Sequence, residues 1–210
     1  MKIMNIMRLC KNVINLFIIN LLLVSFTHSQ KVDTVINTKI YQSSVCKLYK
    51  QPLYVQYELH DGGGNCTDVG RFKNEFNKFE SSDKDYLGSG YIKGHMVNDE
   101  DFSTDCRLKN LTFRYYNCLP QTPNLNKEWE MWENRLREES QGLTYRIISG
   151  GSKFIKKNNL YIPKYLYKIV RSSKGFVYCL WFTNEFKDNT VEELTFEELK
   201  SRLEYTLIMK

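Results

Sequence analysis

The chain has 210 residues, of which 42% are hydrophobic and 26% charged. Its length and ordinary apolar content suit one domain with its own core and argue against a second. The 30 basic and 24 acidic residues give a net charge of +6, but three basic residues lie near the N-terminus. Residues 30–210 therefore carry 27 basic and 24 acidic residues, or +3, which is only a weak indication of a polyanionic partner.

Residues 1–29 have the pattern of a secretory signal peptide. Basic residues precede an uncharged apolar run from Val13 to Phe26, and Thr27-His28-Ser29 forms a small-residue cleavage pattern before Gln30. The run is shorter than the ~20 residues of a spanning helix, which favours cleavage over a retained membrane anchor. We therefore expect one secreted or periplasmic domain over residues 30–210, without stable membrane association after cleavage.

The cysteines of the expected mature chain indicate at least one disulfide, because an exported protein meets an oxidising compartment. Cys106 and Cys118, which flank a short connection, form the first expected pair, and Cys46 and Cys66 form the second. Cys179 is the fifth cysteine, so an odd thiol remains. No CxxC spacing is present, which argues against a cysteine zinc site.

The first half of the domain predicts strands separated by polar segments. We expect a polar lead-in at residues 30–44, an edge strand at 48–59, a glycine turn at 60–65, a surface loop at 67–89 with a short helix around 72–79, a strand at 91–97, an acidic turn at 98–105 and a partner strand at 111–118.

A helix is expected from about Lys127 to Ser140, with Asn124 and Asn126 as capping amides. At 100° per residue, its apolar face holds Trp129, Trp132 and Leu136, which should be buried.

Glu133 lies seven residues after Asn126 and returns to nearly the same helix face. An amide and a carboxylate can therefore point at one site. The alternative is an ordinary exposed acid that pairs with Arg137 at i+4.

The second half predicts strands at 143–148, 160–170 and 176–182, with turns at Gly150-Gly151 and at 172–175. Thr195 and Glu198 form a capping-box pattern that opens a helix toward Leu207. The expected fold class is α+β, with an antiparallel-rich central sheet flanked by helices.

Residues 141–184 contain no acidic residue before Glu185, so their basic residues either form a surface for a phosphate backbone or line the solvent face of strands. Those basic residues are Arg146, Lys153, Lys156, Lys157, Lys164, Lys168, Arg171 and Lys174.

Two stretches carry the chemistry. His95 ends an apolar strand, and an amide-rich loop leads into the helix of residues 127–140. These are the parts needed to activate a water molecule beside a hydrated metal ion.

The same stretches resemble the DNA/RNA non-specific endonuclease family, whose members carry a ββα-metal finger. The resemblance rests on Tyr91-Ile92-Lys93-Gly94-His95-Met96, on residues 113–121 and on Leu125-Asn126. It runs from about Leu53 to Phe182 and is densest between residues 90 and 139.

The resemblance implies a role for each matching residue. His95 is the general base, Lys93 stands near the scissile phosphate, and Asn117 matches an asparagine of the site. Asn126 is the one direct protein ligand of a hydrated Mg²⁺ ion, for which Mn²⁺ or another divalent cation is the alternative, and Glu133 holds water of that ion. The implied activity is hydrolysis of DNA and RNA that leaves 5′-phosphate ends with little base specificity.

The sequence departs from the family pattern at three places. Ile92 replaces the usual aspartate, Lys93 lacks the bidentate fork of arginine, and the helix start after Asn126 is one residue shorter than usual. Asn124 is therefore an alternative metal ligand.

Other functions compete with a metal-dependent endonuclease. A zinc HNH enzyme needs more histidines than His60 and His95. A catalytically decayed, secreted nucleic-acid-binding or surface-interaction protein on the same fold is the main alternative, and a disulfide-stabilised adhesion domain leaves the matched motifs unexplained.

Overall fold

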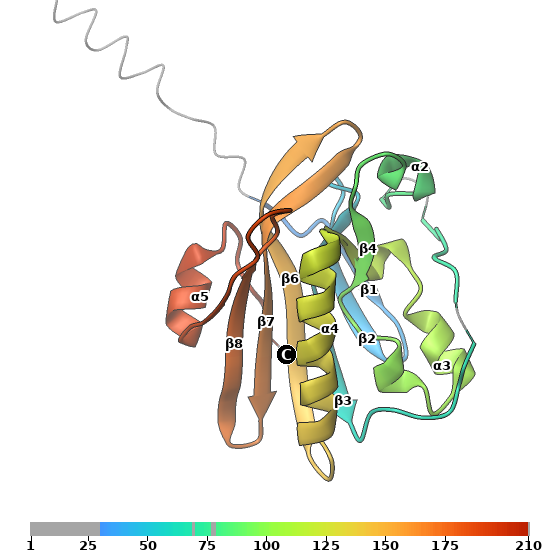
Figure 1. The fold of residues 1–210 in the computed structure, drawn as a ribbon, viewed down its shortest axis with the longest axis vertical. Coiled ribbons are helices and arrows are strands. Elements are labelled where there is room, and N and C mark those ends of the chain that lie inside the picture. Colours follow the sequence, from blue (N-terminus) through green and yellow to red (C-terminus); the bar gives the residue numbers. More distant parts are fainter. Residues whose placement is uncertain (1–29, 69, 77–78, 210) are drawn as a thin grey trace, which may run out of the picture.

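The computed structural model describes residues 30–209 except 69, 77 and 78, so the predicted signal peptide lies outside the described residues. Its centre is an antiparallel seven-stranded sheet in the order β1-β2-β3-β6-β7-β8-β9 (Figure 1). The strands are β1 (Thr34–Asn37), β2 (Tyr41–Cys46), β3 (Gln51–His60), β6 (Thr144–Lys157), β7 (Leu160–Ser172), β8 (Gly175–Thr183) and β9 (Val191–Glu193).

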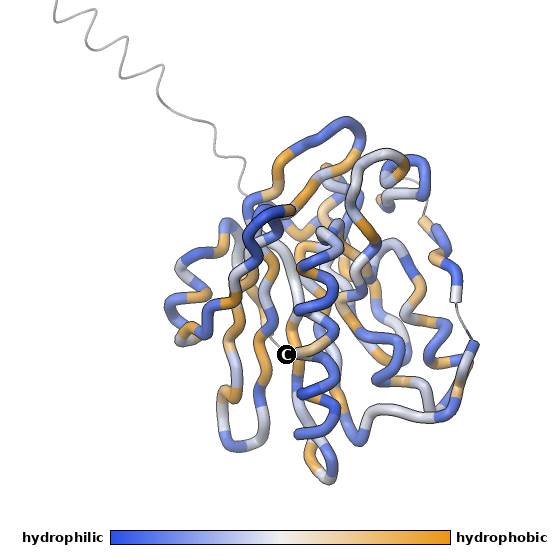
Figure 2. The backbone as a smooth tube through the Cα atoms, in the orientation of Figure 1, coloured by the Kyte–Doolittle hydropathy of each residue, from blue (hydrophilic) through white to orange (hydrophobic). Residues whose placement is uncertain are grey.

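Helices cover the two faces of this sheet. Helix α4 (Pro123–Glu139) packs on one face, whereas α5 (Phe196–Arg202) and the C-terminal segment pack on the other (Figure 1). Along β7, Leu166 and Val170 join the α4 side, and Tyr167 and Ile169 join the α5 side. Because β7 and β8 are buried on both faces, they carry long hydrophobic stretches. Figure 2 shows these stretches beside the mainly hydrophilic α4.

The strands predicted in the second half of the domain are confirmed, but β6 runs straight through Gly150-Gly151 instead of turning there. A Cβ at Gly150 would clash with the Leu53 carbonyl oxygen, and one at Gly151 with the Pro163 side chain, so the glycines permit close packing within a strand. The predicted turn at residues 172–175 is confirmed.

The lead-in predicted for residues 30–44 was wrong, because β1 and most of β2 form there. As a result β3 lies inside the sheet, between β2 and β6, and not at its edge. Pro52 is tolerated because the β2–β3 register is irregular beside it, between Ser44 and Val45.

The short helix predicted around residues 72–79 is absent from the described part of that stretch. A one-turn helix, α2 (Asp83–Tyr86), forms further along the chain. The Ser82–Asp85 capping box accounts for its position. The capping box predicted at Thr195 and Glu198 is confirmed, although α5 ends at Arg202 and does not reach Leu207.

A separate two-stranded sheet carries the histidine. Strands β4 (Ile92–His95) and β5 (Cys118–Gln121) pair antiparallel, with His95 opposite Cys118. The chain between them contains two short 3-10 turns (Glu100–Phe102 and Tyr115–Asn117) and α3 (Cys106–Leu111). The partner strand predicted at 111–118 was therefore wrong, because Asp105 caps a helix just before this stretch by accepting from Arg107 N.

Helix α4 follows β5 directly and completes the ββα arrangement. It begins earlier than predicted, because Thr122 is the cap and accepts a hydrogen bond from Leu125 N at 3.2 Å. Asn124 and Asn126 therefore lie in its first turn and do not cap it. Trp129 and Leu136 are buried as predicted, and Trp132 is partly buried.

The disulfide predictions were wrong in both pairs. Cys66 is bonded to Cys106, with their Cα atoms 5.4 Å apart, and this bond ties the loop after β3 to α3. Cys118 is a free thiol, buried beside the Tyr86 hydroxyl, because Cys106 is already bonded to Cys66. Cys46 and Cys179 are buried free thiols on the α5 side of the sheet.

Among the described residues, none of the helices combines the length and the apolar character of a membrane-spanning segment.

Gly94→Ala is expected to destabilise the fold, because a Cβ at this buried position of β4 would clash with the side chain of Gln121. Such overpacking costs about 1–3 kcal/mol. Chemical denaturation measures it, and a Gln121→Ala background is the control. If Gly94→Ala costs as much in that background as in the parent, steric contact with Gln121 is not the cause.

Candidate active site

A polar pocket of about 310 Å³ lies where β4, the following loop and α4 meet. One hydrogen bond fixes this junction, since Trp129 Nε1 on α4 donates to the His95 carbonyl at 3.1 Å. The pocket is lined by His95, Asn98, Asp99, Glu100, Asn126, Trp129, Glu130, Glu133, Asn134 and Arg137. Three of the predicted site residues, His95, Asn126 and Glu133, therefore share one cavity.

His95 lies against two aromatic rings. The ring centroids of Phe72 and Phe113 are each 4.8 Å from the imidazole centroid, Phe113 in an edge arrangement. Burial lowers the pKa of His95 to about 4, although the nearby Asp99 carboxylate acts to raise it. The imidazole is therefore neutral near pH 7. Its Nε2 atom is buried and has no hydrogen-bond partner among the described residues.

The two candidate metal-ligating asparagines differ in their surroundings. Asn126 is half-buried and lines the pocket with His95. Asn124 is exposed, and its Nδ2 donates to Phe186 O at 3.3 Å, away from the pocket lining. The geometry therefore favours Asn126 over Asn124.

Glu133 lies in the wall of the pocket and is only 4% exposed. Its Oε1 accepts from Lys168 Nζ at 3.1 Å, and its Oε2 accepts from Asn98 Nδ2. Burial raises the pKa of Glu133, whereas Lys168 acts to lower it. The alternative of an exposed acid paired with Arg137 was wrong, since Arg137 pairs with Asp101.

Lys168 was wrongly expected on a basic surface. Its side chain is fully buried, and Nζ lies 4.2 Å from the Trp129 ring centroid as well as beside Glu133. The sequence held a signal for this, because Lys168 is in phase with the core residues Leu166 and Val170 along the strand.

Asn117 lies beneath the site and not in it. Its amide oxygen accepts from Val97 N at 3.0 Å, and its Nδ2 donates to Val97 O at 3.0 Å and Thr112 O at 2.8 Å. The two bonds to Val97 fix the chain just after His95. With its side chain fully buried, Asn117 positions the loop and does not line the pocket.

Lys93 occupies the same face of β4 as His95 and is held by groups that sequence reasoning missed. Its Nζ pairs with Asp83 at 2.5 Å and lies 5.1 Å from the centroid of Phe72, the ring that also contacts His95. Hydrogen bonds from Lys93 and then from Tyr115 lower the pKa of Asp83. By strand alternation, Ile92 points to the opposite face, so replacing aspartate there leaves the His95 face unaltered.

The pocket residues fit a hard divalent cation. Mg²⁺ prefers oxygen ligands and keeps several waters, and the pocket that His95 lines also holds the Asn126 amide and the Glu133 carboxylate. Both oxygens of Glu133 already accept hydrogen bonds, from Lys168 and Asn98, so this carboxylate suits contact through water rather than direct ligation. The other group of potential ligands in the described residues, Cys66, Asp68 and Cys106, is not available in this way because its two thiols form the disulfide.

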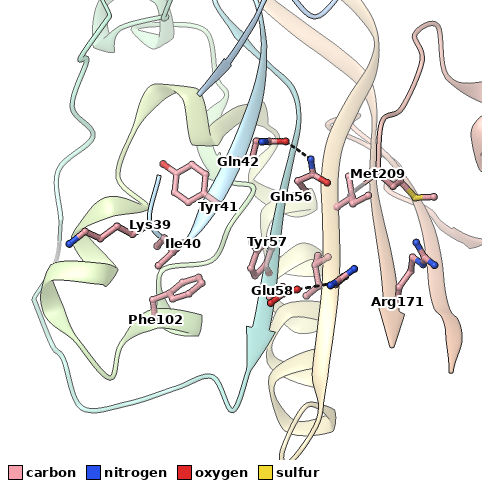
Figure 3. A pocket seen from close by; sticks show the side chains of 13 residues that line it. Lys39, Ile40, Tyr41, Gln42, Gln56, Tyr57, Glu58, Phe102, Arg171 and Met209 are labelled. Carbon is pink, nitrogen blue, oxygen red and sulfur yellow. Dashed lines mark hydrogen bonds and ion pairs between the residues drawn. The ribbon is translucent and has the colours of Figure 1, made fainter. Parts of the chain in front are cut away.

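A larger and more apolar cavity of about 420 Å³ lies beside β2, β3 and β6, and Figure 3 shows its lining. Ile40, Phe102 and Met209 supply apolar surface, and a Glu58–Arg146 ion pair lies at 2.9 Å. It contains neither His95 nor an amide–carboxylate pair from α4, so it is not the catalytic candidate.

Comparison with known proteins agrees with this geometry. A family model described as DNA/RNA non-specific endonuclease matches residues 21–199. A nuclease of Nostoc sp. is 34% identical over 90 residues, which cover 40% of this chain and 33% of that protein. The mitochondrial nuclease EXOG of Xenopus laevis is 31% identical over 114 residues, which cover 44% of this chain and 30% of that protein. The chain thus spans about a third of the length of these curated relatives.

A solved structure extends the similarity to the fold. An EndoG chain from a crystal structure of the EndoG/EndoGI complex matches with a TM-score of 0.69 at 18% identity, over 82% of this chain and 84% of that chain. This likeness confirms the α+β fold class. Because the family model matches most of the sequence, and the finger of β4, β5 and α4 is present, the chain belongs to the DNA/RNA non-specific endonuclease family.

Proposed function

We propose that this protein is an exported, divalent-metal-dependent endonuclease that hydrolyses phosphodiester bonds of DNA and RNA and leaves 5′-phosphate ends. The observation that carries the proposal is that His95, whose Nε2 is buried and unpartnered among the described residues, lines one pocket with Asn126 and Glu133. Family membership and the nuclease relatives support the reaction class.

His95 acts as the general base. Its lowered pKa keeps the ring neutral, so Nε2 can take a proton from a water molecule that attacks the phosphorus. The hydrogen bond from Trp129 to the His95 carbonyl and the two flanking rings hold the imidazole in place.

Asn126 and Glu133 serve the metal. Asn126 is the protein ligand, and Glu133, held by Lys168 and Asn98, orders water on the pocket wall. When bound, a Mg²⁺ ion stabilises negative charge on the phosphate and the leaving 3′-oxygen. Lys93 supplies positive charge on the His95 face of β4, and Asp83 holds its ammonium group in position.

A catalytically decayed nucleic-acid-binding protein is the second candidate, motivated by Ile92 and the shortened start of the helix. Ile92 points away from His95, and Asn126 still shares the pocket with His95, so neither departure removes a group from the site. Activity is therefore the better-supported interpretation.

His95→Ala is expected to reduce Mg²⁺-dependent cleavage of plasmid DNA and structured RNA by about 100-fold or more, because the general base is lost. EDTA should abolish cleavage by the parent domain. The matched control is His60→Ala, since His60 is exposed and lies outside the pocket. Equal cleavage by the His95→Ala variant and the parent would contradict the assignment.

The pH dependence follows from the pKa of His95. Protonation removes the base, so the acid limb of kcat/KM should lie near pH 4–5, well below the ~6.5 of an ordinary histidine. A pH–rate profile on a short DNA substrate measures it. An acid limb centred near 6.5 would show that the imidazole is solvated and not buried.

The lowered pKa of His95 also makes the folding stability of the metal-free protein depend on pH. Between about pH 6.5 and 4, His95 binds a proton in the unfolded chain but not in the folded protein. The free energy of unfolding therefore falls as the pH falls through this range. Unfolding in EDTA should therefore depend less on pH in His95→Ala than in the parent.

Lys168→Met is expected to destabilise the fold by about 3–5 kcal/mol, because Glu133 would be left as an unpaired buried charge. Urea unfolding measures the loss, and Glu133→Gln supplies the second arm of a double-mutant cycle. The combined variant should lose less than the sum of the single losses. Strict additivity would mean that the buried ion pair does not couple the two side chains.

A further inference from the structure

Strands β6 and β7 continue beyond the sheet as a two-stranded hairpin. The register of β6 with β3 ends at Gly150, and that of β7 with β8 begins at Tyr165. Residues 152–164 therefore have no strand partner in the described sheet outside β6 and β7. We call residues 152–164 the hairpin arm, which Figure 1 shows as the orange hairpin at the top of the molecule.

The hairpin arm is uniformly basic. It contains Lys153, Lys156, Lys157 and Lys164 and no acidic residue, and all four lysines are exposed. In the described part of the chain, the lysines in ion pairs are Lys93, Lys109, Lys168 and Lys200, so the arm lysines have no carboxylate partner there. Four neighbouring, uncompensated ammonium groups form a site for several phosphates.

Tyrosine rings support these lysines. Lys156 Nζ lies 5.8 Å from the Tyr161 centroid, and Lys153 and Lys164 Nζ each lie 5.5 Å from the Tyr165 centroid. Contacts of this kind restrict the long side chains while their charged heads stay in solvent. The ammonium groups are thus partly ordered before any ligand arrives.

The hairpin arm is fixed to the catalytic finger by a buried asparagine. Asn184 Nδ2 donates to Pro163 O at 2.9 Å and to Pro120 O at 2.8 Å, and its Oδ1 accepts from Thr122 N at 2.9 Å. One side chain thereby joins the arm, the end of β5 and the cap of α4, four residues before Asn126.

A second contact joins the arm to the histidine strand. Leu160 and Ile162 are buried in one cluster with Tyr115 and Cys118, which belong to the finger. Lys157 Nζ lies 5.5 Å from the centroid of Tyr91, the residue just before β4. The basic arm is therefore packed against the strands that carry the candidate catalytic pocket.

We propose that the hairpin arm binds the sugar-phosphate backbone of a nucleic acid strand beside the catalytic pocket, independently of base sequence. Lysine ammonium groups contact phosphates as point charges and do not read bases. Lysines that only keep a strand face in solvent would not need to lack carboxylate partners. Nor would their hairpin need to be fixed to the finger. The purpose of the arm, delivering substrate, rests on the proposed function, whereas its binding of nucleic acid does not.

Binding without catalysis tests this directly. The domain of residues 30–210 in EDTA is titrated into fluorescent duplex and single-stranded DNA of random sequence, and anisotropy is recorded across a salt series. The arm variant is Lys153→Gln/Lys156→Gln/Lys157→Gln/Lys164→Gln. The matched control removes the same charge from exposed lysines elsewhere, as Lys31→Gln/Lys39→Gln/Lys47→Gln/Lys174→Gln.

The arm variant should bind at least about 10-fold more weakly than the control at 100 mM salt. For the arm variant, the slope of the logarithm of the DNA-binding constant against the logarithm of the salt concentration should be shallower. The difference should be roughly one for each phosphate that the arm no longer neutralises. Thermal melting should be unchanged for both variants, because all substituted side chains are exposed. Equal affinity and slope for the two variants, or no DNA binding by the parent, would overturn the proposal.

Cleavage separates this inference from the proposed function. With Mg²⁺, removal of the arm charges should raise KM for long DNA while leaving kcat within about twofold of the parent. A parent that binds through the arm but never cleaves would contradict the nuclease function and leave the arm intact. A parent that cleaves, with an unchanged KM in the arm variant, would contradict the arm and leave the nuclease function intact.

Discussion

The hydrogen bond from Trp129 Nε1 to the His95 carbonyl joins the two halves of the site. It crosses from α4 to the end of β4, so the helix that carries Asn126 and Glu133 is held against the strand that carries His95. Lys168 supports the same indole ring from the sheet below and neutralises Glu133. Burying this cation is costly, and the cost is offset only because both partners are in place.

The surroundings of His95 follow from the same arrangement. Two phenylalanine rings pack against the imidazole, whose burial lowers its pKa. Asn117 fixes the chain after His95 with two hydrogen bonds to Val97. Gly94 is required one residue earlier because Gln121 fills the space where a side chain would be. In this Gly-His pair, the glycine meets a packing requirement and the histidine is the proposed base.

Local sequence patterns were enough to predict the long strands β7 and β8, the face of α4 that holds Trp129 and Leu136, and the histidine strand. They failed where a contact distant in sequence decides the structure. The disulfide partner of Cys66 depends on how the loop after β3 meets α3. The ion pair of Lys93 depends on Asp83, which begins the unpredicted helix α2. The start of α4 was misplaced for a local reason, because Thr122, and not the asparagines, supplies the cap.

A metal ion held by Asn126 next to a neutral His95 is the arrangement on which the proposed chemistry depends. The most direct test is paramagnetic broadening by Mn²⁺ of the His95 ring signals in NMR spectra of the domain, with Asn126→Ala and Asn124→Ala beside the parent. We expect broadening at low Mn²⁺ in the parent and in Asn124→Ala, and its loss in Asn126→Ala. Broadening that survives in Asn126→Ala and disappears in Asn124→Ala would place the ion elsewhere and contradict this arrangement.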